Sequence, residues 1–457
     1  MITIPVSLLS GVVFGALLWM LSPLKVAVVV LGMVSVVIIM RKPILGLLLF
    51  GFIAPFIPYA TVTLGIRITV SEAILAVTWL GVFWQLLLNR FEFPSGATEK
   101  ALMVLIVFSC IPFFIGQLSI LAEGNGLVNW LRWILNLSVL FLVTILVDNK
   151  QKRDQLIIFL LFGILANLLL SIGLFLKERD AQSMIPILTS LKYSHPEAVK
   201  DIFSGNFTRM ASPWVHPNLT GGALVLFLPL AFFYGLSETG FRRKLGVLVA
   251  LLSAIGLMLS ISRGAIISLV LVLAWLAYLR VPYSSKMILW GGVLAVVLVA
   301  FYPPLQDRLS TMFSSTNAST EVRLDEYRQF PDAVAKYPFG IGFKVDPPVP
   351  ESGLIGISNL WLNVVYKIGF IGLILYLAVS TIWWRETRPK NKVTTITREN
   401  GVWLGSHAGI LAAFATGLFD HYFSFTMVLI SLFWLLVGLN LKESRELGYV
   451  DSSGKAK

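Results

Sequence analysis

Long runs of apolar residues, separated by short polar stretches, fill almost the whole chain. A helix needs about 20 such residues to cross the hydrocarbon core of a bilayer, so each run of this length predicts a membrane span. We predict fourteen spans, at 5–22, 25–40, 43–60, 71–89, 101–121, 130–147, 156–176, 219–236, 245–262, 264–280, 287–303, 359–382, 402–419 and 424–440. The pattern therefore indicates an all-α polytopic membrane protein.

Two polar stretches are longer than a connection between neighbouring spans requires. They divide the chain into an N-terminal bundle of seven spans (1–176), a first long loop (177–218), spans eight to eleven (219–303), a second long loop (304–358), spans twelve to fourteen (359–440) and a tail (441–457). The first apolar run lacks a preceding basic region and a small-residue cleavage site, so we expect a retained span rather than a signal peptide.

Composition and charge agree with this class. Of the 457 residues, 57% are hydrophobic and 13% are charged, and the net charge is +12. If both termini are cytoplasmic, the excess of Lys and Arg falls in the cytoplasmic segments, which is the positive-inside pattern of membrane proteins. This pattern explains the net charge without a nucleic-acid partner. It also places both long loops on the outer (periplasmic or extracellular) side.

The sequence offers little for disulfide or metal chemistry. The one cysteine, Cys110, lies in an apolar run and cannot form a disulfide within the chain. The four histidines do not form a metal-binding pair of the HExxH type. We therefore expect neither a metal site nor another cofactor.

The first of four polar places on the outer side runs from Arg209 to Gly222 and includes His216 and Asn218. Asn218 or Thr220 is a candidate cap for the following helix. A helix N-terminus beside an arginine and a histidine can receive a phosphate. An interfacial turn with no ligand is an equally good interpretation.

The second place is Arg263, where two apolar runs meet at the outer face with almost no loop. This arginine could neutralise a helix C-terminus or extend to the interface. The positive-inside pattern disfavours a lone outer arginine, however, and Gly264 would leave room for a ligand. We therefore favour ligand binding for Arg263.

The third place is a helix expected at 320–336. Its spacing puts Arg323 on the apolar face with Tyr327, Phe330 and Val334. An arginine that packs onto the membrane domain is costly unless it meets an anion. We favour a ligand as that anion, and an ion pair with one of the loop's own acids is the alternative.

The fourth place is the start of the span at 359–382. Asn359, Asn363 and Lys367 recur at every fourth position and follow Ser358. Such a stripe must face the bundle or a water-filled cavity.

Four weaker candidates complete the set. Arg328 lies off the apolar face of its helix, where it could pair with a nearby acid. Asp420 and His421 belong to a short outer turn, for which a plain polar turn is the favoured interpretation. Arg132 stands between two tryptophans, where an interface anchor is more common than a ligand.

Several outward arginines above a membrane bundle suit an anion whose other end is a lipid. Guanidinium groups bind phosphate through paired hydrogen bonds and keep their charge when desolvated. A lipid-linked sugar diphosphate is such a ligand. Glycosyl transfer from it needs cations on the departing phosphates and a positioned acceptor hydroxyl, with or without a general base.

These residues resemble the O-antigen polymerase/ligase family of bacterial envelope glycosyltransferases, over roughly residues 205–440. The resemblance rests on an ordered set of motifs: His216-Pro217-Asn218, Ser260-x-Ser262-Arg263-Gly264, Arg323 and Tyr327 followed by Pro338-x-Gly340-x-Gly342, and Asn359 and Leu362 followed by Gly369 and Gly372. It implies a GT-C-like helical bundle in the bacterial cytoplasmic (inner) membrane. It also implies metal-independent transfer of a glycan from an undecaprenyl diphosphate carrier to an acceptor.

The resemblance also implies roles for single residues. Arg263 and Arg323 match arginines thought to hold the diphosphate. The family usually has a histidine, proposed to activate the acceptor, where this chain has Ser358, and Lys367 stands where an acid is common. The base is open between His216, His421 and a reaction without a strong base. The expected catalytic residues are Arg263, Arg323, His216, Ser358 and Asn359, and the expected substrate-binding residues are Arg209, Asn218, Arg328, Asn363, Lys367, Asp420, His421 and Arg132.

Three functions fit the sequence. The first is a polymerase of lipid-linked repeat units for O-antigen, capsule or exopolysaccharide, with a chain-length regulator as a candidate partner. The second is a ligase that transfers finished glycan to a lipid A core. The third is an anion transporter of the bicarbonate type, which the lack of an inverted repeat disfavours.

Overall fold

The computed structural model describes residues 23–64, 66–120, 125–179, 181–193, 209–301, 303, 306, 318–344, 354, 356–389 and 392–448. The span predicted at 5–22 lies outside these residues, as do parts of both long loops and the end of the tail.

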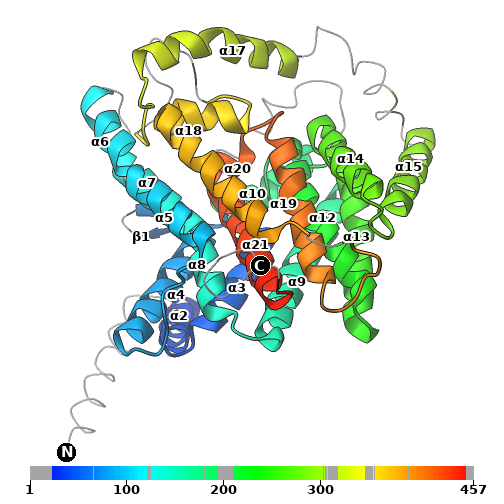
Figure 1. Cartoon of the computed structure of the whole chain (residues 1–457), viewed down its shortest axis with the longest axis horizontal. Coiled ribbons are helices and arrows are strands. Elements are labelled where there is room, and N and C mark those ends of the chain that lie inside the picture. Colours follow the sequence, from blue (N-terminus) through cyan, green and yellow to red (C-terminus); the bar gives the residue numbers. More distant parts are fainter. Residues whose placement is uncertain are drawn as a thin grey trace, which may run out of the picture.

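Helices make up nearly all of the described chain (Figure 1). Their bounds are α2 Pro23–Arg41, α3 Pro43–Phe56, α4 Val70–Leu87, α5 Ala97–Phe108, α6 Cys110–Ser119, α7 Gly126–Leu137, α8 Val139–Leu146, α9 Lys150–Glu178, α10 Ile185–Ser190, α12 Pro217–Ser237, α13 Gly240–Ser260, α14 Arg263–Tyr278, α15 Ser284–Phe301, α17 Ala318–Lys336, α18 Leu360–Thr387, α19 Gly401–Thr416, α20 Tyr422–Phe425 and α21 Met427–Glu446, with a 3-10 turn η1 at Ala181–Met184. The predicted all-α class is confirmed.

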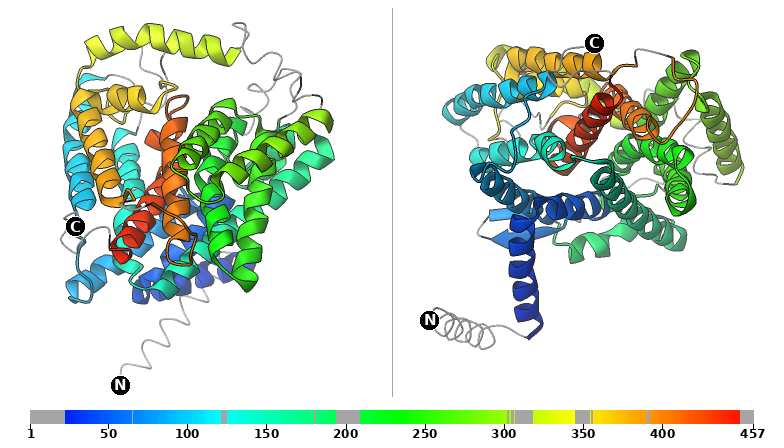
Figure 2. Two further views of the ribbon diagram at one scale, coloured as in Figure 1. Left: turned by 45° about the vertical axis from the view of Figure 1, so that its right-hand side comes forward. Right: turned by 60° about the horizontal axis from the view of Figure 1, so that its bottom comes forward.

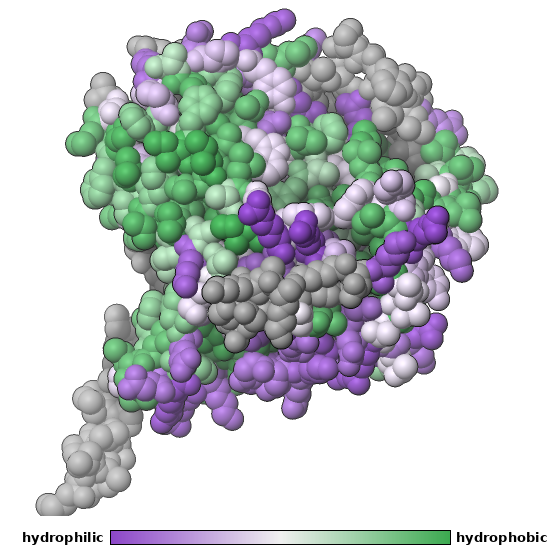
Figure 3. Space-filling view, viewed as in Figure 1, coloured by the Kyte–Doolittle hydropathy of each residue, from purple (hydrophilic) through white to green (hydrophobic). Residues whose placement is uncertain are grey.

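Within the described ranges, nine helical segments are long and apolar enough to cross a bilayer. Shorter apolar helices, among them α3, α14 and α19, occupy other predicted spans. On the molecular surface, a broad apolar region lies between polar residues at the top and at the bottom (Figure 3). The chain is therefore a multi-pass membrane protein. The full number of fourteen spans stays a prediction.

Two predicted spans contain a break at a serine. Ser109 separates α5 from α6, and Ser138 separates α7 from α8. Each serine hydroxyl accepts a hydrogen bond from a tryptophan on another helix, from Trp130 Nε1 at 2.8 Å and from Trp79 Nε1 at 2.7 Å respectively. The breaks therefore coincide with polar contacts between helices.

A short β-hairpin joins α3 to α4, where the sequence predicted only a connection. Its strands β1 (Thr61–Leu64) and β2 (Ile66–Thr69) pair antiparallel. They are rich in β-branched residues, which favour strands. The Thr61 amide donates to the Leu191 carbonyl at 3.1 Å, so the hairpin is tied to the segment that follows α10.

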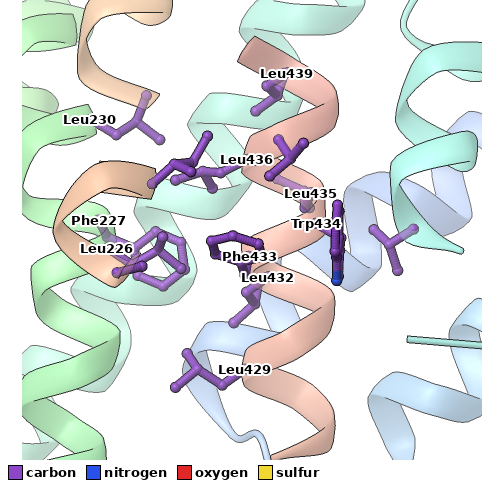
Figure 4. Close-up of a cluster of buried hydrophobic side chains, with 14 of the residues drawn as sticks. Leu226, Phe227, Leu230, Leu429, Leu432, Phe433, Trp434, Leu435, Leu436 and Leu439 are labelled. Carbon is purple, nitrogen blue, oxygen red and sulfur yellow. The ribbon is translucent and has the colours of Figure 1, made fainter. Parts of the chain in front are cut away.

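The centre of the bundle is formed by α12, α19 and α21. Leu226 and Phe227 from α12 lie beside Leu432 and Phe433 from α21 (Figure 4). Small residues let α19 approach α12 closely: a Cβ on Gly405 would lie 2.7 Å from the Leu230 Cα atom. Gly401 and Gly409, one turn away on either side, meet α12 in the same way. This is the close helix packing that small residues at every fourth position allow in membranes.

The end of the bundle that is distant from α17 is stabilised by buried ion pairs. Arg153 at the start of α9 binds Glu443 of α21 at 3.0 Å, and Arg445 binds Glu99 of α5 through two contacts of 2.7 Å. Since Glu443 and Arg445 have these partners, α21 continues to Glu446, beyond the predicted end of the last span at 440.

The other end of the bundle is crossed by α17, which lies over it as a separate helix (Figures 1 and 2). Below α17, the helix α18 is broken at Gly369, whose φ of 73° is outside the helical range. The first part of α18 therefore runs in a different direction from the rest, and it carries the predicted polar stripe.

Candidate active site

The turn between α13 and α14 places Arg263 at the first position of α14. Ile261, which ends α13, has a left-handed backbone (φ 51°, ψ 34°) and is 4% exposed. A β-branched residue in this conformation costs about 1–2 kcal/mol. Strained conformations of this kind persist where surrounding contacts hold them, often at functional sites.

Arg209 provides such contacts. Its side chain is buried, and Nε donates to the Ser260 carbonyl at 2.8 Å. A second nitrogen, Nη2, contacts the Ile261 carbonyl and the Asn218 side-chain oxygen. Arg209 was predicted to bind substrate. In the structure, its side chain stabilises the α13–α14 turn by hydrogen bonds to backbone carbonyls.

His216 caps α12, whereas Asn218 or Thr220 was predicted in that role. The His216 Nδ1 atom accepts from the Asn218 amide at 3.0 Å. Burial, together with the positive charges of Arg209 and Arg323, lowers the pKa of His216 to about 3. The ring is therefore neutral near pH 7, with its Nδ1 lone pair engaged.

Arg263 and Arg323 lie on one pocket, although they are sixty residues apart in the sequence. Arg323 Nη2 is 3.7 Å from Asp420 Oδ2, and the two guanidinium groups are close enough to repel each other. The pocket is lined by Asn218, Ile261, Ser262, Arg263, Gly264, Ala265, Arg323, Thr416, Phe419, Asp420 and Tyr422.

Two features of this pocket differ from what the sequence suggested. The acid beside Arg323 is Asp420, in the turn after α19, whereas the alternative to a ligand had been an acid of Arg323's own loop. Gly264 leaves no room at its Cα for a ligand, because a Cβ there would lie 2.8 Å from the Cβ of Phe419. Gly264 instead allows α14 to pack closely against the residues that follow α19.

The inward face of α17 is fixed by contacts with the segment before α18. The Ser358 amide donates to Glu326 Oε2 at 2.7 Å, and the Tyr327 hydroxyl donates to the Ser358 carbonyl at 3.2 Å. Phe330 and Ala333 pack into a small apolar cluster on the same side. The predicted inward placement of Arg323 and Phe330 is confirmed, but Glu326 was missed.

Arg328 lies on the outward side of α17. Its side chain is 76% exposed and is 3.8 Å from Asp325. The structure therefore does not bring Arg328 to the pocket, and the alternative of pairing with a nearby acid is confirmed.

The polar stripe of α18 lies outside the pocket lining, with Asn363 and Lys367 buried and Asn359 half-buried. Asn359 is the N-cap: its Oδ1 accepts from the amides of Trp361 and Leu362, and its Nδ2 donates to a carbonyl. Asn363 is buried and binds Ser424 Oγ at 3.0 Å. Lys367 is also buried, with Nζ 5.9 Å from the centre of the Tyr366 ring. These residues shape the start of α18, which is a structural role.

Two glycines, Gly340 and Gly369, explain the close packing between the Pro338–Gly342 turn and the start of α18. Gly340 has φ of 85°, and a Cβ on it would lie 2.5 Å from the Lys367 carbonyl oxygen. Gly369, at the break of α18, would clash in the same way with the backbone of Phe339. The Pro338–Gly342 turn and the break in α18 are therefore one packed unit, which requires glycine at both places.

Asp420 lines the pocket, and His421 follows it in the turn between α19 and α20. Asp420 is 9% exposed, and its Oδ1 atom is 3.4 Å from His421 Nδ1. The turn was predicted to be a plain polar turn. In the structure, its Asp420 carboxylate lies close to both Arg323 and His421.

Arg132 is not part of the pocket lining and forms an ion pair with a buried carboxylate. Its Nε donates to Glu72 Oε1 at 2.9 Å, and the Glu72 side chain is 1% exposed. Glu72 also caps α4 by accepting from Thr69, and it accepts from Asn136. The arginine is thus part of a structural network among α4, α7 and the hairpin.

Comparison with protein families agrees with the geometry. Residues 248–377 match the family model described as O-antigen ligase. This range contains Arg263, Arg323 and the broken start of α18. No curated protein matches the chain. The match confirms the resemblance drawn from the motifs over this part of the chain.

Proposed function

We propose that this protein polymerises undecaprenyl-diphosphate-linked repeat units of O-antigen, capsule or exopolysaccharide. The reaction takes place at the outer face of the bacterial cytoplasmic membrane, and both termini are cytoplasmic. A chain-length regulator is the expected protein partner. The observation that carries the proposal is the pocket shared by Arg263 and Arg323 at one end of a membrane bundle.

The pocket suits a diphosphate leaving group. Two guanidinium groups from different elements approach one space, and a single carboxylate, Asp420, lies beside them. Charge builds up on the bridging oxygen as the bond from the sugar to the diphosphate breaks, and fixed cations stabilise that charge. In this proposal, Arg263 and Arg323 supply the cations, and no metal or other cofactor takes part.

Ligation of a finished glycan to a lipid A core is the second candidate. The matching family model carries the description O-antigen ligase, which favours this reading. The two reactions use the same donor chemistry and differ in the acceptor. Purified protein supplied only with lipid-linked repeat units separates them, because a polymerase extends these units and a ligase needs the core lipid.

The central test replaces each arginine in the pocket. We expect Arg263→Ala and Arg323→Ala each to lower polymer formation by about 100-fold or more, since removing one donor to a developing oxyanion has an effect of that size. Arg323→Lys should also impair the reaction, because the planar paired contact with phosphate is lost. Glycan ladders and the amount of protein in the membrane are the measurements.

Arg328→Ala is the matched control, because Arg328 is on the same helix but points outward. It should leave the ladder unchanged. Wild-type ladders from Arg263→Ala and Arg323→Ala would refute their roles. Ion uptake into proteoliposomes without any glycan product would favour the transporter instead.

A further inference from the structure

We propose that His421, oriented by Asp420, is the general base that takes the proton from the acceptor hydroxyl. This inference rests on the proposed glycosyl transfer. It assigns the second half of the reaction, the activation of the acceptor, to the turn between α19 and α20.

The first argument is the position of the Asp420 carboxylate. Its Oδ2 atom is 3.7 Å from Arg323 Nη2, and its Oδ1 atom is 3.4 Å from His421 Nδ1. One oxygen thus faces the cationic pocket, and the other faces the histidine. Asp420 therefore stands between the two sides of the site.

The second argument is the orientation of the imidazole. Nδ1 is buried 3.4 Å from Asp420 Oδ1 and makes no hydrogen bond, since that oxygen accepts from the His421 backbone amide at 2.9 Å, while the His421 side chain as a whole is 34% exposed. A carboxylate at Nδ1 favours the tautomer with its proton on Nδ1, which leaves the Nε2 lone pair available. A Cβ built on Gly356 would lie 3.8 Å from Nε2, so this nitrogen borders the outer segment that leads into α18.

The third argument is the engagement of the neighbouring candidates. His216 Nδ1 accepts from a backbone amide, so the neutral ring carries its proton on Nε2 and has no free lone pair. Glu326 accepts from the Ser358 amide. Ser358 has no basic group. His407 is fully buried among tryptophans of α18 and α19.

In the proposed glycosyl transfer, the acceptor oxygen forms a bond to the anomeric carbon of the donor sugar. The bond from that carbon to the diphosphate oxygen breaks, and the departing carrier keeps the electron pair. The hydroxyl proton moves to His421 Nε2, and the Asp420 carboxylate stabilises the resulting imidazolium. The charged groups facing the ring are Asp420 in its own turn and, beyond it, Arg323 of α17.

The test uses purified full-length protein in detergent with a synthetic polyprenyl-diphosphate-linked repeat unit as both donor and acceptor. Turnover by the wild type establishes the proposed function, and its absence would refute that function rather than this assignment. His421→Ala should lower kcat by about 100-fold to 10,000-fold, the usual contribution of a general base, while KM changes little. Added imidazole should restore part of the rate.

Two further variants keep the test decisive. His421→Gln preserves the size of the side chain and should lose the same rate, so a folding defect of His421→Ala cannot hide the result. Arg263→Ala should gain nothing from imidazole, since it lacks a cation and not a base. Full kcat in either His421 variant would overturn the assignment, as would a loss in His421→Ala that imidazole does not repair.

Discussion

Arg263 and Arg323 show what single residues can reveal before a structure is known. Arg263 was expected at a ligand because the positive-inside pattern disfavours a lone outer arginine, and Arg323 because an arginine on an apolar helix face needs an anion. The structure brings them to one pocket. Asp420 was a candidate in its own right, but its contact with Arg323 could not be inferred because the two residues are far apart in the sequence.

The structure does not place Arg209, Asn359 or Arg132 in the lining of this pocket. Each is a polar group in apolar surroundings, and each meets that need inside the protein, through backbone carbonyls, a helix cap or a carboxylate. Burial of a polar group requires a partner, but it does not say whether that partner is a ligand. The sequence could not distinguish these cases.

Arg132→Ala should destabilise the protein without changing its chemistry. The substitution removes the closest cation from the buried Glu72 carboxylate, at a cost of about 2 kcal/mol. Thermal unfolding in detergent measures this loss, and the double variant with Glu72→Gln should recover part of it. Activity per folded molecule should stay at the wild-type level, and a fall there would show that Arg132 takes part in the reaction.

His216 makes stability depend on pH. Its pKa is lowered to about 3 in the folded chain, against an ordinary value of 6.5. Between these values the unfolded chain binds a proton that the folded chain does not, so the free energy of unfolding falls as the pH drops. We expect His216→Asn, which retains an acceptor for the cap, to show a weaker loss of stability between about pH 7 and about pH 4. Equal pH profiles would contradict this prediction.

At the scale of elements, the hydrophobic pattern located the helices well and their internal breaks poorly. Runs of apolar residues give the length of a span, but the interruptions at Ser109, Ser138 and Gly369 arise from contacts with other helices. The β-hairpin was missed because its short strands resemble a polar connection. Tertiary contacts that decide a break leave no periodic signal in the local sequence.

The approach of α19 to α12 gives a test at this scale. Gly405→Ala adds a methyl group 2.7 Å from a Cα atom of α12, whereas nothing lies within 4 Å of a Cβ on Gly291 of α15. Overpacking of this kind costs about 1–3 kcal/mol. We expect Gly405→Ala to lower the unfolding temperature in detergent and Gly291→Ala to leave it unchanged or raise it slightly. Equal stability of the two variants would contradict the close packing.

At the scale of the whole molecule, the two ends of the bundle differ. One end carries α17 and the pocket, and the other carries the buried ion pairs around Arg153 and Arg445 (Figure 1). The charge pattern of the sequence predicts that the pocket end faces outward. The structure shows which elements lie at each end of the bundle.

Cysteine labelling measures this orientation. In a Cys110→Ser background, we expect Arg328→Cys on α17 to react with a membrane-impermeant maleimide in intact spheroplasts. Glu399→Cys, at an exposed position between α18 and α19, should react only after permeabilisation. The reverse labelling would place the pocket in the cytoplasm and would be incompatible with the proposed reaction.

The contact between Arg323 and Asp420 has a consequence for product release. In the proposed reaction, the carrier would leave with its diphosphate intact and with one more ionisable oxygen than the donor had. A pocket made of cations alone would hold such a product at least as tightly as the substrate. Asp420 would compete for Arg323 and repel the extra charge. The carboxylate that weakens donor binding would therefore also favour departure of the spent carrier.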